Sequence, residues 1–175
     1  MFLNITGGTK KERALVESLT VFSGYDLMTD ATADKLEIDI ELINNLYKTD
    51  GNLADVVYED SNHRPKEFTI RVDKSYSLRR MLESIAHEMV HVAQFATGRW
   101  VELENTKITR FEGKEYKKLP NYWNRPWEIE AHGREVGLFL QWVEKEGLQK
   151  NTILKSLDVE PQEVILLRPK FIEKG

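Results

Sequence analysis

Residues 77–97 carry the strongest secondary-structure pattern in the chain, a helix that begins after Ser77 and ends at Gly98. Apolar side chains cover one broad face of this helix. A broad apolar face must be buried, so the rest of the domain is expected to pack around this helix. His87 and His91 lie together on the roughly opposite side, where they would border a cleft. The apolar side chains that share one broad face are Met81, Leu82, Ile85, Ala86, Met89, Val92, Ala93 and Ala96.

A helix and several strands are expected before this central helix. Thr9 can cap the start of a helix over residues 9–27 that ends near Gly24, and Glu12 completes a capping-box pattern. Strict alternation of apolar and acidic side chains predicts a half-buried strand next. The strands are expected at residues 36–42, 54–59 and 68–72, with a turn at residues 50–52.

A hairpin and a second long helix are expected after the central helix. The hairpin spans residues 107–119 and turns at Glu112 and Gly113, and Pro126 can begin a helix that runs to Glu146. In the tail we expect a short helix at residues 152–157 and an apolar packing segment at residues 164–167. This order predicts an α+β fold, a single domain over residues 1–175 with a small mixed sheet of three or more strands.

The composition restricts the chemistry that this chain can support. Its 175 residues include four histidines and no cysteine, and the formal net charge is -4. The absence of cysteine excludes disulfides, cysteine-ligated zinc, iron–sulfur clusters and thiol nucleophiles. Any metal must therefore be held by histidine, aspartate or glutamate. The small negative charge argues against a dedicated nucleic-acid binder.

Neither a membrane span nor a secretory leader is expected. No apolar run approaches the roughly 20 residues needed to cross a bilayer. Residues 1–8 lack a basic region followed by a long apolar one, so they do not resemble a signal peptide. We therefore expect a cytoplasmic protein without a membrane partner.

The sequence from His87 to His91 reads His-Glu-Met-Val-His, an HExxH motif. Spacing of four residues on a helix places both imidazoles on one face, one turn apart, where they can bind the same zinc ion. Glu88 lies beside them and can act as general base toward a water molecule that the metal activates. With four histidines in the chain, a chance occurrence of the motif has a probability of about 1%.

A catalytic zinc site needs a third protein ligand and an open position. On the wheel of the helix that follows Pro126, the predicted core face consists of Ile129, Val136, Phe139, Leu140 and Val143. Glu128 and His132 lie at its margin, whereas Glu130 points toward solvent. A carboxylate at a buried edge needs a partner, which favours Glu128 as the third ligand. His132 comes second, either as ligand or as a group supporting the site, and Glu130 third.

The motif resembles the active-site helix of the zincin metallopeptidases. Residues 128–132, Glu-Ile-Glu-Ala-His, look like the pattern that follows in small gluzincin-type peptidases, among them the minimal gluzincins and the ImmA/IrrE-type proteases. This resemblance implies that Glu128 is the ligand glutamate. His132 stands where these families usually carry aspartate or asparagine. The resemblance also implies a small sheet before the motif, whose edge strand binds an extended peptide by strand addition.

The chain also resembles the SprT-like peptidases. Residues 87–95 look similar to their motif, and Ala131-His132-Gly133 resembles their third-ligand segment, which would make His132 the ligand. The zinc ribbon of many SprT-like proteins cannot form without cysteine. Residues 124–131 are similar to a segment of uncharacterised metallopeptidases encoded by bacteriophages, which would place the protein in the host cytoplasm.

These observations predict a zinc-dependent peptidase in which Glu88 is the general base and His87, His91 and Glu128 hold Zn²⁺. The oxyanion of the tetrahedral intermediate needs a further donor, and we favour His132 and Tyr122, with Tyr116 and Arg125 as other candidates. The expected partner is a peptide or protein substrate. The alternative is a zinc-binding regulatory or protein-binding module of peptidase ancestry that does not turn over substrate.

Overall fold

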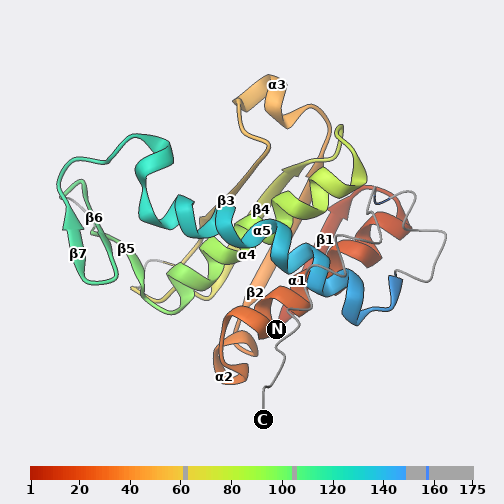
Figure 1. Ribbon diagram of the computed structural model, residues 1–175, viewed down its shortest axis with the longest axis horizontal. Helices are drawn as coiled ribbons and strands as arrows, with labels where there is room; N and C mark the ends of the chain where they lie inside the picture. Colours follow the sequence, from red (N-terminus) through yellow and green to blue (C-terminus); the bar gives the residue numbers. More distant parts are fainter. Residues whose placement is uncertain (61–62, 104–105, 149–156, 158–175) are drawn as a thin grey trace, which may run out of the picture.

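A four-stranded mixed sheet forms one layer of the fold (Figure 1). The computed structural model describes residues 1–60, 63–103, 106–148 and 157. The strands lie in the order β1-β2-β4-β3. Their bounds are β1 Phe2–Gly7, β2 Glu37–Ile43, β3 Ala54–Tyr58 and β4 Glu67–Asp73. The first two pairs of neighbours in this order are parallel, whereas β3 runs antiparallel to β4. β1 and β3 are therefore the two edges.

Three long helices cover one face of this sheet. They are α1 (Lys10–Leu27), α4 (Leu78–Ala96) and α5 (Pro126–Lys145). α4 packs on β3 and β4 and on both other helices, so it lies at the centre of the molecule, with α5 outside it (Figure 1). Shorter helical segments are α2 (Asp30–Ala33), α3 (Leu46–Asp50) and the 3₁₀ turn η1 (Tyr122–Asn124).

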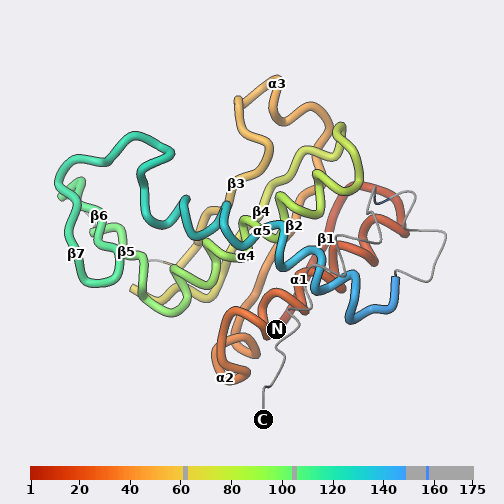
Figure 2. Tube along the Cα trace, viewed as in Figure 1, coloured from red at the N-terminus to blue at the C-terminus, as the bar shows by residue number. Residues whose placement is uncertain are grey.

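A second sheet stands at one end of the molecule, beyond the C-terminus of α4 (Figure 2). It contains β5 (Trp100–Leu103), β6 (Ile108–Phe111) and β7 (Lys114–Tyr116), joined antiparallel in chain order. Gly98, with φ of +75°, lies between α4 and this sheet. Such a φ is strained for residues with a side chain, which explains why glycine ends α4 here.

The core lies between the four-stranded sheet and α4. Alternate residues of β2 point inward, so Ile38, Ile40 and Leu42 are buried while the acidic residues between them are exposed. α4 is buried around its whole circumference from Met81 to Ala96, because the sheet, α1 and α5 surround it. The side of α4 that carries the histidines is thus buried as well.

The α+β class predicted from the sequence is confirmed, and so are the three strands, the central helix and the hairpin. The capping box is present, since the Oγ1 of Thr9 accepts from the N–H of Glu12 at 3.2 Å. The first helix continues past Gly24 to Leu27. β1, β5, α2 and α3 were not predicted. The predicted helix at residues 152–157 and the apolar segment at residues 164–167 lie outside the described residues, apart from Leu157.

The predicted core face of α5 is wrong at two positions. Ile129 and Val136 have exposed fractions of 58% and 38%. The buried face instead includes Trp127, Ala131 and Leu138, together with the two carboxylic acids Glu128 and Glu135. Apolar residues alone do not indicate which face is buried, because polar side chains occupy part of the face that α5 turns toward α4. Within the described residues, no helix is both long and apolar enough to cross a membrane.

Candidate metal centre

Three buried side chains from two helices converge on one point. His87 and His91 come from α4 and Glu128 from the first turn of α5, with exposed fractions of 8%, 5% and 7%. The Nε2 atoms of the histidines are 3.1 Å apart. The Oε2 of Glu128 lies 3.5 Å from Nε2 of His87 and 3.4 Å from Nε2 of His91. These three residues form a group that could hold a metal ion.

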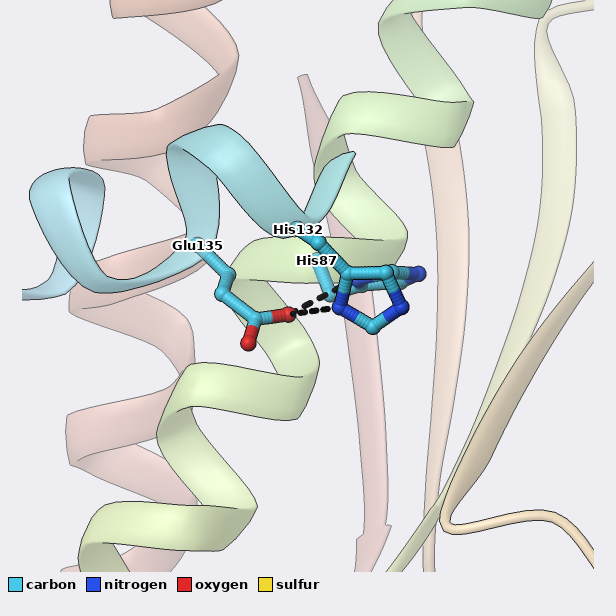
Figure 3. A group of neighbouring side chains, drawn as sticks. All are labelled: His87, His132 and Glu135. Atoms are coloured by element: carbon cyan, nitrogen blue, oxygen red, sulfur yellow. Dashed lines mark hydrogen bonds and ion pairs between the residues drawn. The ribbon is translucent and has the colours of Figure 1, made fainter. Parts of the chain in front are cut away.

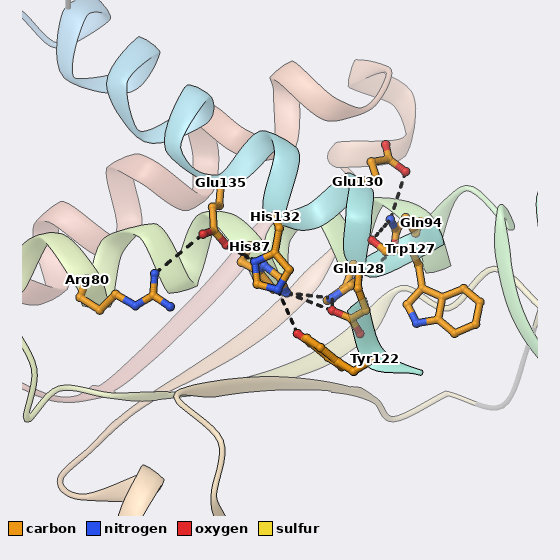
Figure 4. A network of polar contacts seen from close by, with 10 residues as sticks. Arg80, His87, Gln94, Tyr122, Trp127, Glu128, Glu130, His132 and Glu135 are labelled. Atoms are coloured by element: carbon orange, nitrogen blue, oxygen red, sulfur yellow. Dashed lines mark hydrogen bonds and ion pairs between the residues drawn. The ribbon is translucent and has the colours of Figure 1, made fainter. Parts of the chain in front are cut away.

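Each histidine is oriented through its other ring nitrogen. Nδ1 of His87 lies 2.8 Å from the Oε2 of Glu135 (Figure 4). Nδ1 of His91 lies 2.8 Å from the Oε1 of Gln94. Both partners accept, so both Nδ1 atoms donate. The Nε2 atom of each ring, which faces Glu128, is then the atom left to bind a metal, as metal-binding histidines require.

The Oε2 of Glu128 is buried and has no hydrogen-bond partner among the described residues. Burial acts to raise the pKa of Glu128, but its contacts with His87 and His91 hold that pKa well below the usual range for glutamate. A buried carboxylate without a hydrogen bond is costly unless a cation lies beside it. A cation beside this atom would offset that cost.

The pKa of His87 is also changed by the negative charges around it. Burial lowers its pKa, but its contacts with Glu128 and Glu135 outweigh burial and raise the pKa to about 9. A proton on His87 thus supplies the positive charge when no metal is bound. A metal ion must displace this proton in order to bind.

Glu88 is 5% exposed and is next to His87, one of the residues that could hold a metal. Burial raises its pKa to about 6, against the opposing effect of His91 and His87. A carboxylate with a raised pKa is better suited to accept a proton and later return it than an ordinary glutamate. Its position and its pKa both fit a general base.

His132, Tyr122 and Glu135 form a second group beside the first. The Oε2 of Glu135 lies between Nδ1 of His87 and Nδ1 of His132, at 2.8 and 3.2 Å (Figure 3). Nε2 of His132 is 3.1 Å from the hydroxyl of Tyr122. Since Nδ1 of His132 donates to the carboxylate, its Nε2 accepts from the phenol O–H. His132 therefore orients Tyr122.

His87, His132 and Glu135 are also close enough to share a metal ion. The short contacts within this group are, however, two hydrogen bonds that the carboxylate of Glu135 accepts from the two histidines. His87 cannot donate from Nδ1 and ligate through that atom at once. Among the described residues, no metal-binding group combines His87, His91 and His132 as an SprT-like site would.

The sequence predicts that Glu130 points toward solvent, and this prediction is wrong. Its side chain is 17% exposed, and it accepts from Arg99 at 2.6 and 3.1 Å and from Gln94 at 3.1 Å. The described residues include no group in which it could serve as a metal ligand.

Two hollows meet beside His87 and Glu88. One, of about 550 Å³, extends along β3 toward the aromatic side chains of Tyr58, Phe95 and Trp100. The other, of about 360 Å³, extends past Arg80 and Trp123. His87, Glu88, Tyr122, Asn52 and Ala54 line both. The edge strand β3 therefore runs beside the candidate site.

The other candidate donors lie elsewhere. Tyr116 contacts Trp127 edge-on, and the Nε of Arg125 donates to the carbonyl of Pro120 at 3.3 Å. Neither lines the hollows that contain Glu88. Tyr122 does line them, and burial together with Glu128 raises the pKa of its phenol, so it stays protonated as a donor.

Gln94 and Glu135 were missed in the sequence, although a signal for Glu135 exists. Glu135 follows Glu128 by seven residues, which returns to the same helix face after two turns. Gln94 follows His91 by one turn, where a side chain can reach the imidazole. Arg99 gives no comparable signal, because its contact with Glu130 depends on how α5 packs on α4.

Comparison with known proteins adds no family assignment: no protein-family model, no curated protein and no solved structure matches this chain.

Proposed function

We propose that this protein is a zinc-dependent metallopeptidase. The observation that carries this proposal is the triangle formed by Nε2 of His87, Nε2 of His91 and Oε2 of Glu128, with sides of 3.1, 3.5 and 3.4 Å. Ligand atoms about 2.1 Å from a tetrahedral zinc ion lie about 3.4 Å from one another. Two nitrogens and one carboxylate oxygen are also the ligand types that zinc accepts in catalytic sites.

When bound, zinc supplies Lewis-acid activation of water and of the scissile carbonyl. Glu88 accepts the proton of the attacking water and delivers it to the leaving amine. Tyr122 donates its O–H to the oxygen of the carbonyl as negative charge develops there. Without substrate, His132 accepts this O–H and donates to Glu135, which holds the phenol beside the site. On substrate binding the single O–H would turn from His132 to the carbonyl oxygen.

The proposed substrate is an extended peptide that pairs with β3. β3 is an edge strand, since among the described strands it pairs only with β4, and an edge strand can accept a further strand. A peptide added there would pass beside Glu88, because Ala54–Tyr58 line the same hollow as the metal-binding group. Main-chain hydrogen bonds would give affinity, and the aromatic end of this hollow would select apolar side chains. Such a protein would act in the cytoplasm.

The test combines metal content with turnover. The purified protein should contain about one zinc ion per chain by elemental analysis and should cleave members of a peptide library, with products identified by mass spectrometry. Glu88→Gln should keep its zinc and lose about 100-fold or more in kcat, since a general base contributes 10²–10⁴-fold. Glu17→Gln, an exposed glutamate on α1, is the matched control. Full activity of Glu88→Gln would contradict the mechanism, and zinc without turnover would favour a regulatory module.

A further inference from the structure

A fully buried glutamine connects His91 to α5. Gln94 is 0% exposed and lies one turn after His91 on α4. Its Oε1 is 2.8 Å from Nδ1 of His91. Its Nε2 donates at 3.1 Å to the carbonyl of Trp127 and at 3.1 Å to the Oε2 of Glu130.

These two acceptors determine which way the amide of Gln94 points. A backbone carbonyl and a carboxylate can only accept hydrogen bonds, so the amide nitrogen must face them. The amide oxygen must then face His91. An amide oxygen can only accept, which leaves Nδ1 of His91 as the donor and its Nε2 free to bind a metal.

Glu130 is itself held by a cation from outside α5. Arg99 donates to both of its carboxylate oxygens, at 3.1 and 2.6 Å, in a bidentate pair. Arg99 also donates to the Oε1 of Glu112, at 2.7 and 3.2 Å, in the turn between β6 and β7. A continuous series of contacts thus runs from the second sheet to His91, through Glu112, Arg99, Glu130 and Gln94.

We propose that Gln94 is a positioning residue that fixes the ring of His91 for metal binding, and that Glu130 and Arg99 hold Gln94 in the required orientation. This inference rests on the proposed zinc site. It gives Glu130 a role beside the metal centre without making it a ligand.

The first test measures zinc affinity by competition with a chromophoric chelator. Gln94→Leu removes both functions of the amide at similar size and should weaken zinc binding by about 10- to 100-fold, the usual effect of losing such a partner. The two arginines that contact Glu130 provide a matched pair. Arg99→Ala should weaken zinc binding, whereas Arg134→Ala, which removes a 51% exposed side chain 3.3 Å from Glu130, should leave it unchanged.

The second test separates orientation from general damage to the fold. In zinc-loaded protein labelled with ¹⁵N-histidine, the Nδ1–H proton of His91 should give a slowly exchanging signal. That signal should be lost in Gln94→Leu and kept in Arg134→Ala. If Gln94→Leu does not fold, the two arginine variants still decide the question.

The outcomes are distinct. If the wild-type protein binds no zinc, the proposed function fails. If it binds zinc, and Gln94→Leu and Arg99→Ala bind zinc within twofold of the wild type and keep the Nδ1–H signal, the metallopeptidase proposal stands and the positioning role is wrong.

Discussion

Nε2 of His87 and Nε2 of His91 face one another at 3.1 Å, while both Nδ1 atoms are engaged by acceptors on their far sides. Two imidazole lone pairs this close repel unless a positive charge lies between them. The nearby Oε2 of Glu128, which has no hydrogen bond in the described structure, adds to that requirement. The arrangement therefore needs a proton or a metal ion between these atoms.

Removing one ligand should abolish tight zinc binding, while removing the adjacent acid should not. Glu128→Ala should lose stoichiometric zinc because only two ligands remain. Glu130→Ala should still bind one zinc ion per chain, more weakly than the wild type. Elemental analysis after dialysis against a weak chelator measures both. If Glu130→Ala loses its zinc while Glu128→Ala keeps it, Glu128 is not the ligand.

Zinc should stabilise the fold, because the folded state assembles all three ligands. At a free zinc concentration 100 times Kd, the free energy of unfolding should increase by about 2.7 kcal/mol. Thermal melts in zinc and in EDTA measure this difference. In Glu128→Ala the melts in zinc and in EDTA should coincide at the same zinc concentration. A shift in that variant as large as in the wild type would contradict the assignment of Glu128 as a ligand.

Tyr122→Phe should impair turnover without affecting the metal. The phenol lines both hollows and contacts Nε2 of His132, and Tyr122 is not one of the three residues that could hold the metal. Loss of one oxyanion donor costs about 10²–10³-fold in kcat. Steady-state kinetics and zinc analysis on the same preparation measure the two effects. Unchanged kcat would exclude Tyr122 as the donor.

Asp73 should make stability depend on pH in acid. Burial acts to raise its pKa, but the N–H groups of Tyr47 and Ser75, which donate at 2.9 and 2.8 Å, lower it. Because the folded-state pKa is the lower one, its contribution is complete above the unfolded value of about 3.9 and is lost as pH falls through the folded value. Asp73→Asn should weaken this dependence below about pH 4.

Urea unfolding at several pH values measures the effect of Asp73→Asn, which should also cost about 1–3 kcal/mol at neutral pH. Asp26→Asn, on the exposed side of α1, is the control and should behave as the wild type. A pH profile of Asp73→Asn identical to that of the wild type would show that other carboxylates cause the acid sensitivity.

Close contact of α5 with α4 depends on a small residue. Ala131 is 0% exposed and packs with Ala86 and Val90 of α4. Ala131→Leu should cost about 1–3 kcal/mol through overpacking. Gly133→Ala, where an added Cβ meets nothing within 4 Å, should instead stabilise the helix by about 0.5–1 kcal/mol. Denaturant unfolding in EDTA compares the two, and equal stabilities would contradict this account of the packing.

The elements with a local pattern could be predicted from sequence. Alternation in residues 36–42, the cap at Thr9 and the proline at the start of α5 act over a few residues, and the structure agrees with each. β1 was missed because its identity depends on pairing with β2, which follows it only after α1 and α2. β5 was missed for a similar reason, since it becomes a strand by pairing with β6.

The convergence of His87, His91 and Glu128 could be predicted, but its surroundings could not. Glu128 was assigned by placing it at the margin of a core face, although that face was wrong at Ile129 and Val136. It is buried because α5 turns it toward α4. The same rotation carries Glu135 to His87 and Glu130 to Arg99, contacts that depend on packing between helices distant in the chain.

The ligands of the candidate metal centre are divided between α4 and α5, with the whole second sheet between them in the chain. An unfolded or partly opened chain retains only the two histidines of α4 as a local pair. Escape of a bound ion then requires only that α5 lift from α4, without melting of the four-stranded sheet. The rate of metal exchange would accordingly measure a local opening of one helix, and it can be much faster than global unfolding.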